Sequence, residues 1–294
     1  MKWRGQRKST NVEDTRGQRV RAAGSAAGGV ALMDFVMRRF GIKGVLVLAV
    51  AGFLAVNFGL IDPAVLVGGG ASTEAVDYQG SAEENETFEF VTVVLGLTED
   101  AWSAEFAGAG LRYREPTLVV YRKRTETGGC GMGDARMGPF YCPGDEKIYI
   151  DLEFYDALAR EFDAPGDFAQ AYVIAHEIGH HVQKLLGITE RVAARQGRPD
   201  YNEYSVRLEL QADYFAGVWA HHSRRFLEEG DLQEALRAAN AIGDDAIQKR
   251  SQGRVVPEAF THGTSAQRMR WFNRGLERGS LEDGDTFAVP YAEL

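Results

Sequence analysis

The strongest constraint on this chain is the segment His176–His180, which reads HEIGH and matches the pattern HExxH. The segment lies in a largely apolar run, residues 168–186, that predicts one continuous helix between a suitable N-cap, Asp167, and a suitable C-cap residue, Gly187. Residues i and i+4 of a helix lie on one face, about one turn apart. The two histidines can therefore bind one metal ion, with Glu177 beside it. Histidines without a ligand role are the alternative, which is disfavoured because unpaired ionisable rings are costly to bury on an apolar helix.

A tetrahedral zinc site with an open position needs a third protein ligand. Gln183 and Leu186 stand where a glycine and a third histidine would complete the longer pattern HExxHxxGxxH, so that source of a ligand is absent. Residues 207–213 instead place Glu209 and Asp213 at positions i and i+4 of a second predicted helix. We expect Glu209 to be the third metal ligand and Asp213 to accept a hydrogen bond from a ligand histidine. The alternative is a pair of solvated carboxylates on a surface helix.

Three protein ligands and one open position predict a zinc-bound water that Glu177 deprotonates as general base. His262 lies in a loop before a helix that Thr264 could cap. His262 is our candidate for a second catalytic residue that stabilises an oxyanion, with Tyr214 as another candidate. An equally good interpretation makes His262 a residue that only anchors its loop. His181 is turned about 100° from His180 around the helix and should face elsewhere.

The N-terminal part of the chain predicts a membrane anchor. Residues 1–43 carry a net charge of +7, residues 44–61 form an 18-residue apolar run, and the remaining chain from residue 44 carries −16. We expect a basic, disordered cytoplasmic leader (1–43), one transmembrane helix (44–61), a linker (62–81) and an extracytoplasmic domain (82–294). A cleaved signal peptide is disfavoured because the basic leader is too long. The acidic outer part argues against nucleic-acid binding.

The chain contains two cysteines, Cys130 and Cys142, both after the apolar run. In an oxidising compartment such a pair predicts a disulfide that closes the glycine-rich loop between them. Metal binding by the two thiolates is the alternative, but their spacing lacks a CxxC partner.

Residues 82–294 are long enough to form one domain with a sizeable core. We predict an α+β, mostly helical fold with a small sheet. The predicted helices cover residues 84–96, 98–107, 154–162, 168–186, a segment around 207–219, 232–249 and 264–277, and the predicted strands cover 117–121 and 147–152. The strand at 148–152 either offers its edge to an extended peptide or lies inside the sheet.

Five groups of residues together resemble the bacterial membrane-anchored putative neutral zinc metallopeptidase family. They are Trp3–Gly5 with Asn11–Asp14, Tyr141–Pro143 with Ile148–Asp151, His176–Gln183, Glu209–Trp219 and Thr261–Arg268. The resemblance covers nearly the whole chain and implies a zincin-like fold with a glutamate as third ligand. By motif, it gives the ligand role to His176, His180 and Glu209 and the general-base role to Glu177.

Two positions depart from the family pattern. Thr15 stands where an arginine is more common, and Tyr214 follows Asp213 where a cysteine is common, which argues against a reactive thiol at that position.

We therefore expect a single-pass inner-membrane zinc peptidase that cleaves a protein or peptide substrate. A membrane-tethered scaffold or binding protein with a structural zinc ion is the alternative, and a fourth protein ligand would favour it. A metal-dependent hydrolase of a non-peptide bond is a third possibility.

Overall fold

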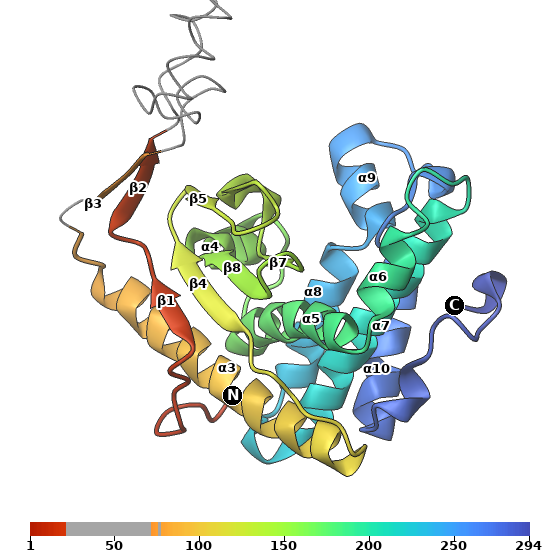
Figure 1. The fold of residues 1–294 in the computed structure, drawn as a ribbon, viewed down its shortest axis with the longest axis horizontal. Coiled ribbons are helices and arrows are strands. Elements are labelled where there is room, and N and C mark those ends of the chain that lie inside the picture. Colours follow the sequence, from red (N-terminus) through yellow and green to blue (C-terminus); the bar gives the residue numbers. More distant parts are fainter. Residues whose placement is uncertain (22–71, 76–77) are drawn as a thin grey trace, which may run out of the picture.

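The computed structural model describes residues 1–21, 72–75 and 78–294 of the chain (Figure 1). The helices are α3 (Ala82–Gly108), α4 (Glu153–Arg160), α5 (Asp167–Leu185), α6 (Ile188–Ala193), α7 (Tyr201–His222), α8 (Asp231–Ala241), α9 (Asp244–Gln252) and α10 (Ser265–Arg278). The strands are β1 (Val12–Asp14), β2 (Gln18–Arg21), β3 (Ser72–Ala75), β4 (Thr117–Tyr121), β5 (Arg124–Glu126), β6 (Met132–Asp134), β7 (Phe140–Cys142) and β8 (Lys147–Asp151). The architecture is a mostly helical α+β domain with a small mixed sheet.

The central sheet has the strand order β1-β4-β8-β7. β1 pairs with β4 and β4 with β8 in parallel, whereas β7 runs antiparallel to β8. Side chains alternate between the two faces, as the period of a strand requires. Leu118, Val120, Ile148 and Ile150 join the main hydrophobic core, and the opposite face carries Val119, Tyr121, Cys142 and Tyr149.

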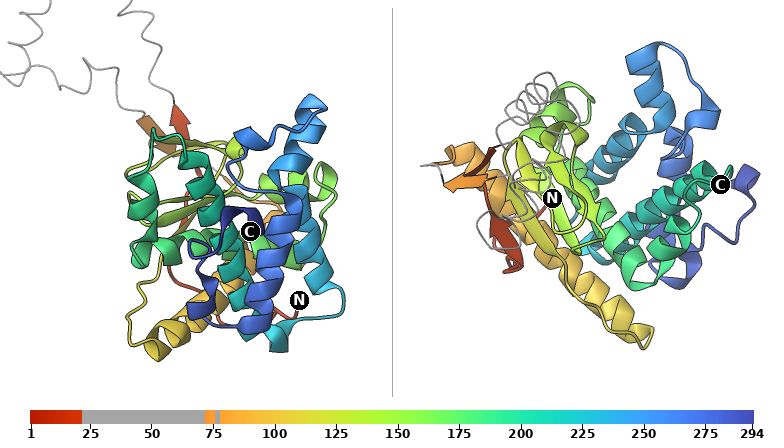
Figure 2. Two further views of the ribbon diagram at one scale, coloured as in Figure 1. Left: turned by 90° about the vertical axis from the view of Figure 1, so that its right-hand side faces the viewer. Right: turned by 45° about the horizontal axis from the view of Figure 1, so that its top comes forward.

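Helix α5 lies between two parts of the molecule. The sheet and α3 lie on one side of α5, and α7, α8 and α10 lie on the other (Figures 1 and 2). Helix α5 is long and most of its residues are buried, and its buried apolar side chains belong to the main hydrophobic core. The helix that carries the HExxH pattern is therefore held by packing on both sides.

Short side chains let the helices around α5 approach one another closely. A Cβ atom added to Gly179 of α5 would lie 2.8 Å from the carbonyl oxygen of Ala212 in α7. The same holds between α7 and α10, where Gly217 lies against Phe272 and Gly275 against Tyr214. No side chain larger than hydrogen fits at these three glycines without a shift of backbone.

Residues 1–21 belong to the folded domain. Met1 and Trp3 are buried, β1 pairs with β4, and the α-ammonium group of Met1 lies 3.0 Å from Asp167 at the start of α5. The prediction that residues 1–43 form a disordered leader is therefore wrong for residues 1–21. The sequence does not reveal this pairing, because β1 has three residues, two of them acidic, and resembles a loop.

The predicted transmembrane helix, residues 44–61, lies outside the described residues. Within the described ranges, no helix has both the length and the hydropathy needed to span a bilayer. Strand β2 pairs with β3, which falls inside the predicted linker 62–81. In the described part of the chain, residues 1–21 therefore pair with segments that follow residues 44–61.

Two helix predictions need correction. The helices expected at 84–96 and 98–107 are one helix, α3, because the hydroxyl of Thr98 donates to the carbonyl oxygen of Leu95 instead of capping a new helix. The helix expected at 232–249 is divided into α8 and α9, since Gly243 lies against the backbone of Ser265 and the chain turns there.

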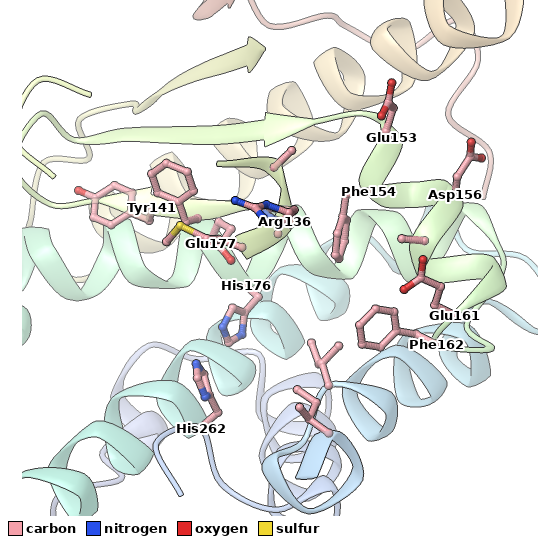
Figure 3. A pocket seen from close by; sticks show the side chains of 18 of the residues that line it. Arg136, Tyr141, Glu153, Phe154, Asp156, Glu161, Phe162, His176, Glu177 and His262 are labelled. Carbon is pink, nitrogen blue, oxygen red and sulfur yellow. The ribbon is translucent and has the colours of Figure 1, made fainter. Parts of the chain in front are cut away.

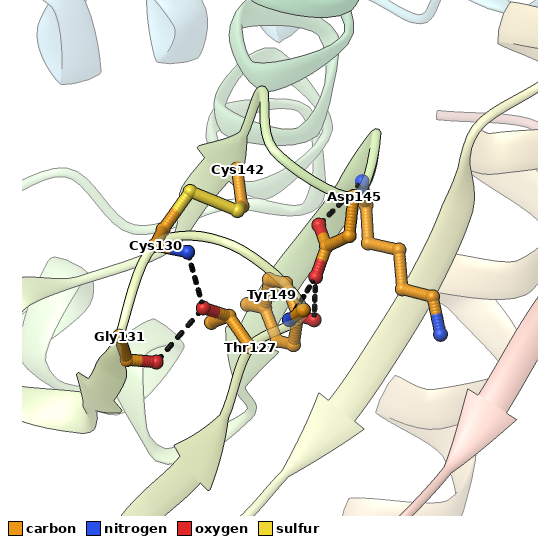
Figure 4. Close-up of a disulfide and its surroundings, with 8 residues drawn as sticks. Thr127, Cys130, Gly131, Cys142, Asp145 and Tyr149 are labelled. Atoms are coloured by element: carbon orange, nitrogen blue, oxygen red, sulfur yellow. Dashed lines mark hydrogen bonds between the residues drawn. A yellow bond between two sulfur atoms is a disulfide. The ribbon is translucent and has the colours of Figure 1, made fainter.

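Cys130 and Cys142 form a disulfide in the structure. Cys142 belongs to β7, and Cys130 lies in the loop that joins β5 to β6 (Figure 4). Asp145 braces this loop, because its carboxylate accepts hydrogen bonds from the backbone N–H of Gly128 and from the hydroxyl of Tyr149. The disulfide and Asp145 tie the β5–β6 loop to the turn between β7 and β8.

Candidate metal centre

Helix α5 presents His176, Glu177 and His180 to one cleft. The two imidazole rings lie one turn apart with their centroids separated by 4.8 Å, and they meet edge to face. His176 and Glu177 are buried. Their surroundings explain why this part of the helix is polar although the rest is apolar, since each polar side chain has a partner from another element.

Helix α7 supplies the carboxylate that joins the two histidines. The Glu209 Oε2 atom lies 3.2 Å from His176 Nε2 and 3.6 Å from His180 Nε2. The close approach of α7 to α5 at Gly179 makes these distances possible. The structure thus brings together the three side chains that the sequence predicts as metal ligands.

The three ligand atoms have separations that suit a tetrahedral cation. With metal–ligand distances of about 2.0–2.1 Å, ligand atoms of a tetrahedral site lie about 3.3 Å apart. The observed distances of 3.2 and 3.6 Å bracket this value, and all three atoms lie within 4.8 Å of one another. Two imidazoles and one carboxylate form the donor set of catalytic zinc sites. The residues present therefore fit a zinc ion.

Asp213 holds the ring of His176 from the side opposite the ligand atom. Its Oδ1 atom lies 2.8 Å from His176 Nδ1 and accepts a hydrogen bond of 2.5 Å from the hydroxyl of Tyr172. Arg268 of α10 donates to both oxygens of Asp213, at 2.8 and 2.9 Å. Asp213 therefore fixes the orientation of His176, and Arg268 compensates the buried charge of Asp213.

Gln183 holds the ring of His180 in position in a similar way. Its Oε1 atom lies 2.9 Å from His180 Nδ1, and its amide nitrogen donates to the backbone oxygen of Leu208 and to the side chain of Gln211. Gln183 is fully buried. No sequence pattern assigns Gln183 a role, although its position three residues after His180 puts it on the same side of the helix.

The ionisable groups of the site shift the pKa values of one another. Burial disfavours the protonated form of His176, but Asp213 and Glu209 outweigh this effect and raise the pKa of His176 to about 9. Burial also raises the pKa of Glu177, with partial compensation from His180 and His176. A raised pKa brings Glu177 closer to the range in which a carboxylate works as general base near neutral pH. A metal cation would compete with protons for the ring nitrogens of His176 and His180.

His262 lines the same cleft from the loop before α10. Its Nδ1 atom lies 3.2 Å from Asp244 Oδ1. The other carboxylate oxygen of Asp244 accepts hydrogen bonds from the backbone N–H groups of Thr261, His262 and Gly263. The hydrogen bond with Asp244 raises the pKa of His262, against its burial. Both interpretations of the sequence therefore have support, because the loop is anchored by Asp244 while the ring faces the cleft.

Two other residues considered from sequence do not join the site. The hydroxyl of Tyr214 donates to the backbone oxygen of Ser280 at 2.6 Å, so this side chain does not reach the cleft as an oxyanion donor. His181 is fully buried between the hydroxyl of Tyr141 and the backbone oxygen of Arg114. It links α5 to β7, as expected for a ring that faces away from the metal ligands.

The cleft has a volume of about 1100 Å³, and its lining includes His176, Glu177, His180, Glu209, His262 and Arg268 (Figure 3). One wall comes from residues 135–141 and from α4, and the other from the end of α8, from α9 and from His262. The floor consists of His176, Glu177, His180, Glu209 and Arg268. Strand β7 lies at the edge of the sheet beside this floor, and the backbone of Tyr141 acts to lower the pKa of Glu177, against the larger effect of burial.

Residues 1–287 match the model of the family described as "Putative neutral zinc metallopeptidase". The chain belongs to this family. It is 47% identical over 292 residues to "Uncharacterized protein YpfJ" of Escherichia coli strain K12, and the match covers 98% of this chain and 99% of that relative. "Uncharacterized protein Rv2575" of Mycobacterium tuberculosis strain H37Rv is 40% identical over 222 residues, with 71% of this chain and 73% of the relative covered. No solved structure matches the chain.

Proposed function

We propose that this protein is a zinc-dependent peptidase with a zincin-like active site. The observation that carries the proposal is the convergence of His176, His180 and Glu209 on one point at the floor of a cleft, with Glu177 beside them. Among the described residues, no fourth acid, thiolate or imidazole joins this group. A structural zinc site would require four protein ligands, so the donor set favours the enzyme over the scaffold.

A zinc ion held by these three residues would supply Lewis acidity and lower the pKa of water toward neutrality. The protein residues perform the remaining steps. Glu177 accepts a proton from the attacking water and delivers it to the nitrogen of the leaving amine. The backbone of Tyr141 favours the charged form of the Glu177 carboxylate. Asp213 and Gln183 hold the histidine rings in position throughout.

The substrate would bind as an extended peptide along β7. From the sequence, the strand at residues 148–152 is one candidate for an edge that binds a peptide, but β8 lies inside the sheet between β4 and β7. Strand β7 is the edge strand nearest the metal centre, and no other strand of the described chain pairs with its outer side. Its free backbone groups can form hydrogen bonds with a peptide in the cleft.

The decisive test replaces Glu177 by Gln, which preserves shape and removes the base. We expect zinc-loaded Glu177→Gln protein to retain one zinc ion per chain, measured by mass spectrometry of the metal, and to lose peptide hydrolysis by about 10²–10⁴-fold. Glu203→Gln, at an exposed position of α7, is the matched control and should behave as the parent. Undiminished hydrolysis by Glu177→Gln protein would show that the general-base assignment is wrong.

His262 acts in this proposal as a charged donor to the oxyanion. Since Asp244 raises the pKa of His262, the imidazolium persists above its ordinary pKa, and kcat/KM should fall as pH rises through the raised value. Asp244→Asn removes the stabilising charge, so this decline should move to lower pH. His262→Gln should abolish the decline and reduce kcat by about 10²–10³-fold. An identical pH profile for Asp244→Asn and parent would leave His262 only its loop-anchoring role.

We further propose that residues 44–61 attach the protein to the cytoplasmic membrane and that the domain faces the oxidising, extracytoplasmic side. The Cys130–Cys142 disulfide supports this compartment. Because β1 pairs with β4, we place residues 1–21 on the same side as the domain.

A further inference from the structure

The lining of the cleft includes five large apolar side chains, which come from both walls. Met137 and Phe154 belong to one wall, Ile242 and Ile247 belong to the other, and Phe162 lies in the segment after α4. We call these five side chains together the apolar wall. Met137 is 69% exposed and Ile247 39% exposed, and both belong to the few large apolar side chains that the described residues leave open to solvent. Exposed apolar side chains gathered in a concave site next to reactive groups are typical of ligand pockets.

The apolar wall is held in place by contacts behind it. The guanidinium group of Arg250 in α9 lies 4.6 Å from the ring centre of Phe162 and donates to the backbone oxygens of Glu161 and Ala241. Phe154 packs against the chain at Gly138, where an added Cβ would lie 3.4 Å from the ring. The two aromatic rings lie on the same side of His176 in the cleft (Figure 3). The wall therefore exists before a ligand binds.

The charged side chains at the rim of the cleft are of both signs, so the rim is not a binding site for ligands of one charge. Arg136 forms an ion pair with Asp134 at 2.9 Å, and Glu153 forms one with Arg122 at 3.1 Å. The other charged side chains of the rim are one basic and two acidic: Arg160, Asp156 and Glu161. Charge selection by this rim would be weak, whereas the apolar wall can discriminate by burial of apolar surface.

We propose that the apolar wall is a specificity subsite that accepts one large apolar side chain, such as Phe, Leu, Ile or Met, adjacent to the scissile bond of an extended peptide. This inference rests on the proposed peptidase function. An apolar pocket distinguishes side chains that differ by one methylene by about 10–200-fold, so a large apolar residue should be preferred over Ser or Ala by at least about 10-fold.

The first experiment measures cleavage. A peptide library is incubated with the zinc-loaded full chain, and the cleaved bonds are identified by mass spectrometry. We expect large apolar residues to be enriched on one side of the cleaved bond. Ile247→Lys and Met137→Lys should reduce this enrichment and shift cleavage toward acidic residues, without loss of folding because both positions are exposed. Met132→Lys, at a residue 44% exposed on β6 outside the cleft, is the matched control and should keep the parental preference.

The second experiment measures binding without turnover. Zinc-loaded Glu177→Gln protein is titrated with two fluorescent peptides that differ only in Phe or Ser at the selected position. The Phe peptide should bind at least about 10-fold more tightly, and adding Ile247→Lys should remove the difference. Cleavage without apolar preference, or equal binding of both peptides, overturns the subsite. Apolar preference in binding without cleavage by the parent overturns the peptidase proposal and leaves the subsite intact.

Discussion

Asp213 has a double function because two positive partners approach it from different elements. It orients His176 of α5 and it neutralises Arg268 of α10, and its side chain has no exposed surface. Burial would raise the pKa of Asp213, but the charges of Arg268 and His176 outweigh it and hold that pKa below its ordinary value. A charged Asp213 gives His176 a strong acceptor and makes the ring a better metal ligand.

Removal of Arg268 should therefore damage stability first. Arg268→Leu leaves a buried carboxylate with one fewer partner, and we expect a loss of about 3–5 kcal/mol in the free energy of unfolding, measured with urea. Addition of Asp213→Asn should restore much of the stability, since no buried charge then lacks a partner. Zinc affinity should stay low in the double variant because the carboxylate is absent.

The control for this series is Arg237→Leu, which changes an exposed arginine of α8 and should shift the free energy of unfolding by less than about 0.5 kcal/mol. If Asp213→Asn failed to improve the stability of Arg268→Leu, the two residues would not form the coupled pair described here.

The site residues differ in how far the sequence predicts them. His176, Glu177 and His180 follow from local spacing, and Glu209 with Asp213 follows from a second i, i+4 pair. Arg268 could not be assigned a role, because its partner lies 55 residues earlier in the chain and no local pattern joins them. Gln183 is local, but its function depends on the side-chain conformation of His180 and on the amide's contact with α7.

At the level of elements, the crossing of α5 and α7 determines the metal geometry. Glu209 reaches the histidines because Gly179, within the HExxH segment, permits contact with Ala212. The sequence predicts both helices but not this contact, since a glycine in a helix is locally unfavourable and its benefit appears only in the packed structure. Strand β7 is not predicted from the sequence for a similar reason, because it has three residues and its extended conformation depends on pairing with β8.

Gly179→Ala tests the importance of this crossing. Alanine is the better helix former, but its Cβ would lie 2.8 Å from the Ala212 carbonyl oxygen, so the helices must separate. We expect a loss of about 1–3 kcal/mol in the free energy of unfolding and weaker zinc binding, measured by competition with a chelator. Gly108→Ala is the control, since Gly108 ends α3 and has no atom within 4 Å of an added Cβ. Parental zinc affinity in Gly179→Ala protein would contradict the role of the close approach.

For the whole molecule, the N-terminal segment connects the sheet, α3 and the active helix. β1 extends the sheet beside β4, Ser9 bonds to buried Glu99 of α3, and the Met1 ammonium group lies near Asp167 and Asp231 at the starts of α5 and α8. The positive charge of this segment predicts that it lies on the other side of a membrane from the domain. Several of those charges are instead paired with acidic residues of the domain, as in the ion pairs Arg4–Glu86 and Lys8–Glu89.

The fold predicts that the N-terminal segment and the domain share one compartment. Thr10→Cys and Arg237→Cys place a reactive thiol at an exposed position of each part. In intact bacterial spheroplasts, we expect a membrane-impermeant maleimide to label both variants equally, and lysed cells should label both as the control for reactivity. Labelling of Arg237→Cys alone would mean a single crossing, with β1 unpaired from β4 in the native membrane protein. If both thiols were protected until lysis, the two parts would still share one compartment, as the pairing of β1 with β4 requires. The extracytoplasmic location would then be refuted, although the disulfide requires an oxidising compartment.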